Sequence, residues 1–154
     1  MKTLVSLVAF LTAAFFCLDA HGFCKVTASS VNFGSYDAFR NTPVDSRGSV
    51  TIECDEAPPP TVTILLSASS TTGGFSPRAM KQVNGPDVLY YNLYTDSTMS
   101  SVWGDGTSGT APVVQPKVKK NDPPRVVPVY GRIAPGQNVS VGEYLDALTV
   151  TVTW

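Results

Sequence analysis

The sequence predicts an all-β protein built as an antiparallel sandwich, and three observations lead to this prediction. Apolar and polar residues alternate in several short segments rich in β-branched and aromatic side chains. Twelve glycines and twelve prolines are spread between these segments. After the first residues, no segment combines helical periodicity with capping residues at both ends, so neither an α/β nor a helical fold is expected.

The N-terminus has the features of a secretory signal peptide. A basic start is followed by an uncharged, apolar run over residues 3–18. This run is shorter than the roughly 18–20 residues that a membrane-spanning helix needs. We expect residues 1–22 to be the leader, with cleavage after Ala20 or Gly22. Residues 23–154 then form one exported domain, since about 130 residues suit a single core.

Six segments of the exported part have the pattern of strands. The first three segments alternate apolar with polar residues, the fourth segment is rich in tyrosine, and the fifth is rich in valine. Pro-rich or Gly-rich sequences that favour turns lie between them. The expected strands are 25–33, 49–54, 61–66, 88–94, 125–133 and 145–154.

The last segment is the most regular of the six. Apolar side chains occupy its even positions, and threonines separate them, which predicts a strand with one buried face. Two interpretations fit this pattern: a strand flanked by earlier strands of its own chain, or the edge of a fold that another molecule's strand completes. The apolar residues are Leu148, Val150, Val152 and Trp154.

Cysteine usage agrees with export. Cys17 leaves with the predicted leader, and Cys24 and Cys54 remain. Two thiols in an oxidising compartment are expected to pair. A disulfide that closes a loop of about 30 residues stabilises the fold by roughly 3–4 kcal/mol in the chain-entropy model.

Charge argues against polyanionic partners. The chain has 11 basic and 12 acidic residues and a formal net charge of −1, so neither nucleic acid nor an anionic membrane is an expected partner. One segment, 115–125, contains four cations and three prolines. It is either a contact loop for a polyanion or a solvated hairpin that protects a sheet edge. We favour the hairpin, because one short cluster attracts only weakly in physiological salt.

The residues needed for common enzymatic chemistry are missing. The only histidine, His21, lies in or beside the leader, so a Ser-His-Asp or Cys-His arrangement is not expected in the folded body. With both cysteines paired, neither a metal site nor a bound cofactor is expected. Residues 104–109 match G-x-G-x-x-G, but no helical pattern follows, as a dinucleotide site would require.

Two pairs of aspartates are candidates for the paired carboxylates of a glycosidase: Asp37 with Asp45, and Asp96 with Asp105. Each lies beside Gly, Ser, Thr or Pro, where aspartate commonly forms turns. We interpret all four as turn or loop residues and expect no enzymatic activity.

Several segments, in this order along the chain, resemble the spore coat protein U-like domain: 31–37, 75–80, 91–96, 102–107, 129–133 and 142–154. The resemblance extends from Cys24 to Trp154. It implies an immunoglobulin-like pilin domain of archaic chaperone–usher pili, bacterial surface fibres linked to biofilm formation and motility.

The resemblance also implies partners and a site. Subunits of this kind lack their seventh strand, and a periplasmic chaperone and then the N-terminal strand of the next subunit fill the resulting groove. An outer-membrane usher is the further partner that such a fibre needs. Leu148, Val150, Val152 and Trp154 would line one wall of the groove, which favours the incomplete-fold interpretation of the last strand. Cys24 and Cys54 would correspond to the family's disulfide.

The segment ahead of Cys24 departs from the pattern of a polymerising subunit. A donor strand takes roughly ten residues or more, and only 21–23, or Phe23 alone, would precede Cys24 after cleavage. The sequence therefore predicts a tip or chain-initiating subunit, or a coat protein that does not polymerise by strand exchange.

The alternative function is a secreted adhesive module that binds a ligand through exposed aromatic side chains. The candidates for such contacts are Tyr36, Phe39, Phe75 and Trp103. Contiguous apolar side chains at loop tips would favour this alternative over a purely structural role.

Overall fold

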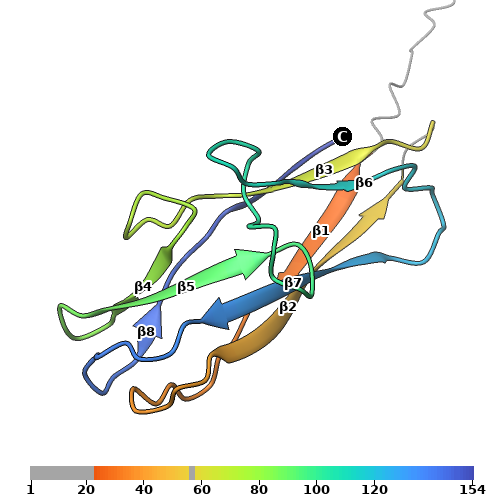
Figure 1. Cartoon of the computed structure of the whole chain (residues 1–154). Helices are drawn as coiled ribbons and strands as arrows, with labels where there is room; N and C mark the ends of the chain where they lie inside the picture. The colour runs from red at the N-terminus through yellow and green to blue at the C-terminus, as the bar shows by residue number, and fades with distance from the viewer. Residues whose placement is uncertain (1–22, 56–57) are drawn as a thin grey trace, which may run out of the picture.

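The computed structural model describes residues 23–55 and 58–154, so the predicted leader lies outside the described residues. These residues form nine strands and no helix (Figure 1). The strands are β1 (Cys24–Ser29), β2 (Val44–Cys54), β3 (Val62–Leu66), β4 (Arg78–Gln82), β5 (Val88–Tyr94), β6 (Val113–Gln115), β7 (Arg125–Ile133), β8 (Tyr144–Leu145) and β9 (Val150–Thr153).

The strands form two sheets that face each other. Six strands are ordered β1-β2-β7-β5-β4-β8, three are ordered β6-β3-β9, and neighbouring strands are antiparallel. The smaller sheet lies over part of the larger one, at the top of Figure 1. The predicted all-β antiparallel sandwich is confirmed.

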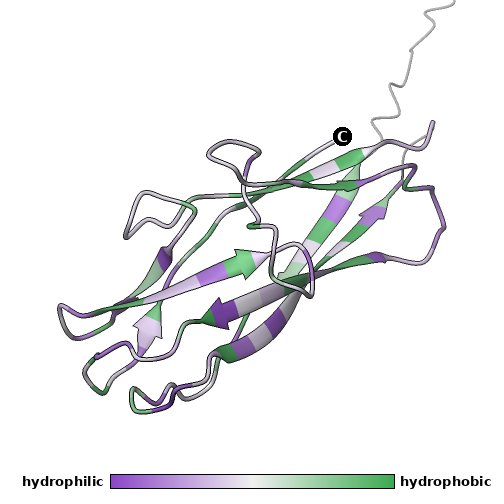
Figure 2. Ribbon diagram, viewed as in Figure 1, coloured by the Kyte–Doolittle hydropathy of each residue, from purple (hydrophilic) through white to green (hydrophobic). Residues whose placement is uncertain are grey.

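The core follows from the period-2 alternation of the strands. Inward-facing residues of β2, β3, β5 and β7 are buried while their neighbours face outward, and Figure 2 shows the resulting bands of hydropathy. The core side chains from these strands are Val50, Ile52, Cys54, Val62, Ile64, Leu66, Leu89, Tyr91, Leu93, Val127, Val129 and Ile133.

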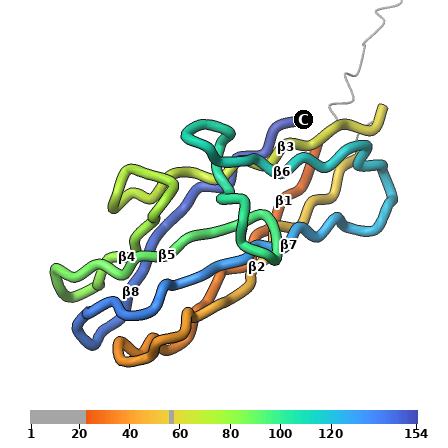
Figure 3. Tube along the Cα trace, viewed as in Figure 1, coloured from red at the N-terminus to blue at the C-terminus, as the bar shows by residue number. Residues whose placement is uncertain are grey.

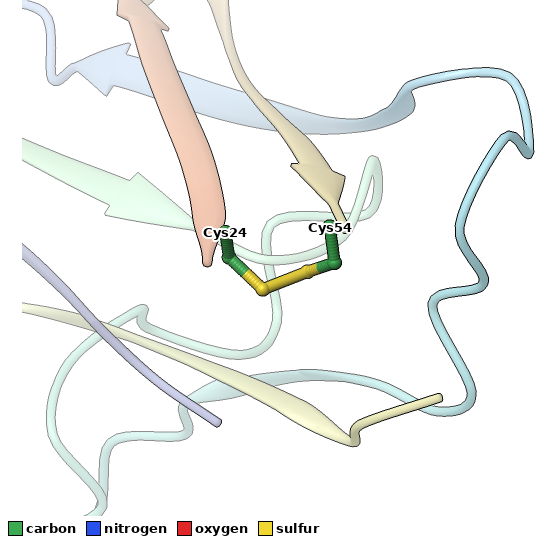
Figure 4. Close-up of a disulfide and its surroundings, with 2 residues drawn as sticks. All are labelled: Cys24 and Cys54. Atoms are coloured by element: carbon green, nitrogen blue, oxygen red, sulfur yellow. A yellow bond between two sulfur atoms is a disulfide. The ribbon is translucent and has the colours of Figure 1, made fainter. Parts of the chain in front are cut away.

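The predicted disulfide between Cys24 and Cys54 is confirmed (Figure 4). The two residues face each other in the register of β1 and β2, with their Cα atoms 4.1 Å apart. The bond therefore ties the first strand of the larger sheet to its neighbour.

The expected strand 25–33 ends early, at Ser29. Beyond it the chain crosses the inner face of the larger sheet, where two glycines leave room. A Cβ atom on Gly131 would lie 2.7 Å from Phe33 and 2.8 Å from Val31, and one on Gly48 would lie 2.8 Å from Val31. Val31 and Phe33 thus pack where these two strands offer no side chains of their own.

The expectation that Trp103 is an exposed aromatic contact is wrong. Its side chain is fully buried, and its indole N–H donates to the Ile64 carbonyl at 3.2 Å, so it belongs to the core and offers no exposed contact. The loop that contains it runs along the β6 side of the smaller sheet, where the Gly104 carbonyl accepts from the Leu66 amide. Arg78, also fully buried, donates to the Trp103 carbonyl at 2.7 Å.

The other motifs lie in loops. Residues 104–109 form turns with no helix after them, so the structure gives no support to a dinucleotide site. Asp37, Asp96 and Asp105 each accept a hydrogen bond from the amide two residues ahead, as turn aspartates do. Asp45 is the exception: it lies in β2, so its interpretation as a turn or loop residue was wrong, and its carboxylate pairs with Arg132 of the neighbouring strand β7. In the basic segment, Val118 is buried and anchors the connection between β6 and β7.

Candidate functional site: an open groove in the sandwich

A groove of about 1080 Å³ opens into the core between two long segments, 28–39 and 139–150. Well-packed interiors rarely contain voids larger than a water molecule, so a space of this size is not a packing defect. Its floor consists of core side chains from both sheets and from the loop after β5: Val50, Leu66, Leu89, Tyr91, Leu93, Trp103, Val129 and Ile133.

One wall of the groove ends in the free edge of β9. The Ser67 amide donates to the Thr149 carbonyl at 3.0 Å, which fixes the phase of the pairing between β3 and β9. In an antiparallel pair, hydrogen-bonded positions alternate with positions whose main-chain groups point away. The N–H and C=O groups of Val150 and Val152 therefore point to the open edge. Within residues 23–55 and 58–154, no strand pairs with that edge.

The opposite wall begins with the free edge of β1. The Asp55 amide donates to the Phe23 carbonyl at 2.9 Å, so by the same alternation the main-chain groups of Val26 and Ala28 point away from β2. In the part of the chain that the structure describes, this edge also has no partner strand. Each sheet thus presents one unpaired edge at the groove.

Tyr36 lines the groove and ties its segment to the loop after β7. Its hydroxyl donates to the Ala134 carbonyl at 3.3 Å and accepts from the Gln137 amide at 2.7 Å. The Gln137 side chain in turn bonds both main-chain groups of Tyr90, with distances of 2.7 and 2.8 Å. This network joins the segment 28–39 to the loop after β7 and to β5.

A polar cluster lies inside the otherwise apolar groove. The Tyr91 hydroxyl donates to the Asp146 carboxylate at 2.8 Å, and the Ser70 hydroxyl lies 3.5 Å from the other carboxylate oxygen. Burial raises the pKa of Tyr91 well above its usual range, and the hydrogen bond to Asp146 raises it further. The phenol therefore stays protonated and acts as the donor.

The four predicted wall residues occupy different positions. Leu148 and Val150 line the groove. Val152 is half-buried against the core but lies outside the groove lining. Trp154 follows the end of β9, and its exposed fraction is 51%. Val31, Phe33 and Asp146 also line the groove, and no local pattern predicts this, because their placement depends on partners distant in the sequence.

The described residues contain no group of three or more His, Cys, Asp or Glu side chains that could hold a metal ion. In the same part of the chain, no helix has the length and apolar character needed to cross a membrane.

Comparison with known proteins places the chain in a family. The sequence profile of the spore coat protein U domain matches residues 10–151. The chain belongs to the spore coat protein U domain family. A relative from this comparison, Protein U of Myxococcus xanthus, is 30% identical over 146 residues, covering 86% of this chain and 78% of Protein U.

Two solved structures are similar to this spore coat protein U domain. One is the CsuC–CsuE chaperone–tip adhesion subunit pre-assembly complex from the archaic chaperone–usher Csu pili of Acinetobacter baumannii, with a TM-score of 0.59 and 23% identity. That match covers 87% of this chain and 40% of the other. The E. coli Hda pilus minor tip subunit, HdaB, has a TM-score of 0.46 and 18% identity, over 83% and 79% of the two chains. The first likeness is one of fold, and the expected immunoglobulin-like sandwich is confirmed.

Proposed function

We propose that this chain is a non-enzymatic structural subunit of a chaperone–usher surface fibre. It passes through the periplasm bound to a chaperone and is assembled at an outer-membrane usher. At the cell surface, a strand from a neighbouring subunit occupies the groove. The observation on which this proposal depends is the open core between two unpaired sheet edges.

The geometry of the groove supports an extended strand over a small ligand. A strand added beside β9 would pair with the main-chain groups of Val150 and Val152, which supply affinity independent of sequence. Its inward side chains would cover Leu89, Leu93 and Val129 and remove apolar surface from water. The family and the likeness in fold to a chain from a chaperone–subunit complex agree with this occupant.

The position of the subunit in a fibre, at the tip or at the start of the chain, remains a prediction from the residues ahead of Cys24. The signal peptide remains a prediction as well, because residues 1–22 lie outside the described residues.

Periplasmic co-expression tests the proposal. The exported chain is produced with and without a periplasmic chaperone of the archaic chaperone–usher class, and complexes are separated by size-exclusion chromatography. We expect a one-to-one complex with the chaperone and aggregation without it, because the exposed core would otherwise associate non-specifically. A stable monomer that ignores the chaperone would rule out the proposed function.

One matched pair of variants directs this test to the groove. Val150→Asp places a charge on the half-buried face of β9, and Thr151→Asp places the same charge on its exposed face. We expect the first variant to lose the chaperone complex and the second to keep it. Equal behaviour of the two variants would mean that the chaperone binds elsewhere.

A second candidate function is adhesion, favoured by the exposure of two loop residues. Phe39 is 94% exposed, and Val141 is fully exposed. Their loops are joined through Tyr36 and lie at the same end of the molecule (Figure 1). Of the other predicted aromatic contacts, Tyr36 and Phe75 are half-buried and Trp103 is buried.

Surface attachment tests adhesion separately from assembly. The double variant Phe39→Ser with Val141→Ser should reduce the binding of the purified protein to polystyrene, since apolar loop tips would make the contact. Val126→Ser is the control, because Val126 is 62% exposed on the outer face of β7. Equal binding of both variants would remove adhesion through these loops.

A further inference from the structure

Asp146 places a carboxylate in the groove, next to a floor of apolar core side chains. Asp37 and Glu143 also line the groove, but they are exposed at its rim. Asp146 is half-buried, and its carboxylate touches the hydroxyl of the core residue Tyr91. An inserted strand would cover this carboxylate, and covering a charge without hydrogen-bond donors is costly.

The acceptor capacity of Asp146 is only partly used. An ionised carboxylate offers about four acceptor positions. One is filled by Tyr91 at 2.8 Å, and Ser70 approaches a second at the long distance of 3.5 Å. Arg78 is fully buried nearby, yet within the described residues its guanidinium donates only to neutral oxygens, those of Phe75, Asn92, Ser67 and Trp103. The carboxylate can therefore accept a further donor from the groove side.

The position of Asp146 along its wall addresses a problem that apolar alternation leaves open. A slip of one residue turns every side chain of a strand to the other face, so alternation prevents it. A slip of two residues keeps all apolar side chains inward and is not prevented. A single buried polar position can fix register in such cases, as it does in coiled coils.

We propose that Asp146 sets the register of the strand that occupies the groove, by accepting a hydrogen bond from a donor side chain such as an amide, a hydroxyl or an ammonium group. This inference rests on the proposed function. Counted back from the end of β9, the positions on this face of the wall are Val152, which lies beyond the groove lining, and then Val150, Leu148 and Asp146, which line the groove. A strand antiparallel to β9 therefore presents three apolar side chains and then the donor, at its fourth inward position.

A C-terminal extension provides the test. The exported chain is extended after Trp154 by a four-residue turn and a strand with five inward valines and outward threonine and lysine residues. In a series of variants, asparagine replaces one inward valine at a time. The melting temperature of each is measured by circular dichroism, in the wild-type background and with Asp146→Leu.

We expect the all-valine extension to raise the melting temperature above that of the unextended chain. Asparagine at the fourth position should melt about 5 °C or more above asparagine at the third or fifth. With Asp146→Leu this preference should disappear. Asp146→Asn, which keeps an acceptor oxygen and nearly the same shape, should retain part of it and serves as the reference if the leucine variant folds poorly.

The outcomes separate the two proposals. If no extension stabilises the chain, the groove does not accept a strand, and both the proposed function and the register inference fail. If the all-valine extension stabilises but asparagine is equally unfavourable at every position, only the register inference is overturned. A fourth-position preference that survives in Asp146→Leu would also overturn it, because another group would then provide the acceptor.

Discussion

The two edges of the smaller sheet are finished in different ways. On the β6 side, the chain fills the core itself: Trp103 is fully buried, although it also reaches the floor of the groove, and Val118 is buried in the connection to β7. On the β9 side, the C-terminal segment passes from β8 to β9 (Figure 3). The groove opens into the core beside this segment. Leu148 and Val150, on this side, are only half-buried.

The difference shows which part of the fold this chain stabilises alone. Sheet edges are normally covered, paired or charged. β6 is a terminal strand too, but buried side chains, Trp103 and Val118, fill the core on its side, whereas the core beside β9 is open and the main-chain groups of Val150 and Val152 are free. An edge of this kind is a template for another strand, so stability on the open side should depend on an occupant while stability on the closed side should not.

Truncation of Trp103 should have the largest effect. Trp103→Ala removes a fully buried indole and its hydrogen bond to Ile64, so we expect a loss of about 3–5 kcal/mol in the free energy of unfolding. Val150→Ala on the open side should cost less than about 2 kcal/mol, because Val150 is already half exposed. Urea denaturation of the unextended chain measures both losses. Equal losses would contradict the conclusion that the chain alone stabilises the β6 side more than the β9 side.

Loss of the disulfide should come next. Cys24→Ser with Cys54→Ser opens a loop with a sequence separation of 30, and the free energy of unfolding should fall by about 3–4 kcal/mol. The loss should also loosen β1, which borders the groove, so chaperone capture should weaken together with stability. Reduction of the wild-type protein should reproduce both effects. Unchanged capture by the reduced protein would mean that β1 is not needed as a groove wall.

The strands with regular alternation could be predicted from the sequence. The expected segments 88–94 and 125–133 coincide with β5 and β7. Strands β6 and β8 were missed because they contain only three and two residues. β4 was missed because it begins with a buried arginine, whose burial depends on acceptors from three separate loops or strands.

The candidate site could be predicted only on one side. The alternation of the last segment pointed to Leu148 and Val150, which line the groove. The opposite wall could not be predicted, because it depends on the chain after β1 packing over Gly48 and Gly131. No local sequence pattern reveals this contact. The role of Asp146 could not be predicted, because its hydrogen-bond partner Tyr91 lies 55 residues away in the sequence.

The smallest expected effect is a loss of stability at low pH, which arises from Asp96 in the loop that leads to Trp103. Asp96 accepts hydrogen bonds from the Thr98 hydroxyl and from the amides of Ser100 and Ser101, and these bonds hold the pKa of Asp96 well below its usual range. A depressed folded-state pKa adds stability above the unfolded value of about 3.9, and this stability is lost as the pH falls from there towards the folded value.

Asp96→Asn should therefore melt below the wild type at pH 7, and the difference should shrink as the pH falls below about 4, because the wild-type carboxylate becomes protonated. Thr98→Val, which removes the strongest of these donors but keeps the carboxylate, should lie between the two. Thermal unfolding from pH 7 to pH 2 measures these differences. A gap that stays constant over this range would mean that Asp96 stabilises the loop through its shape alone. The charge of Asp96 would then not contribute to the stability of the β6 side, which would come from the packing around Trp103.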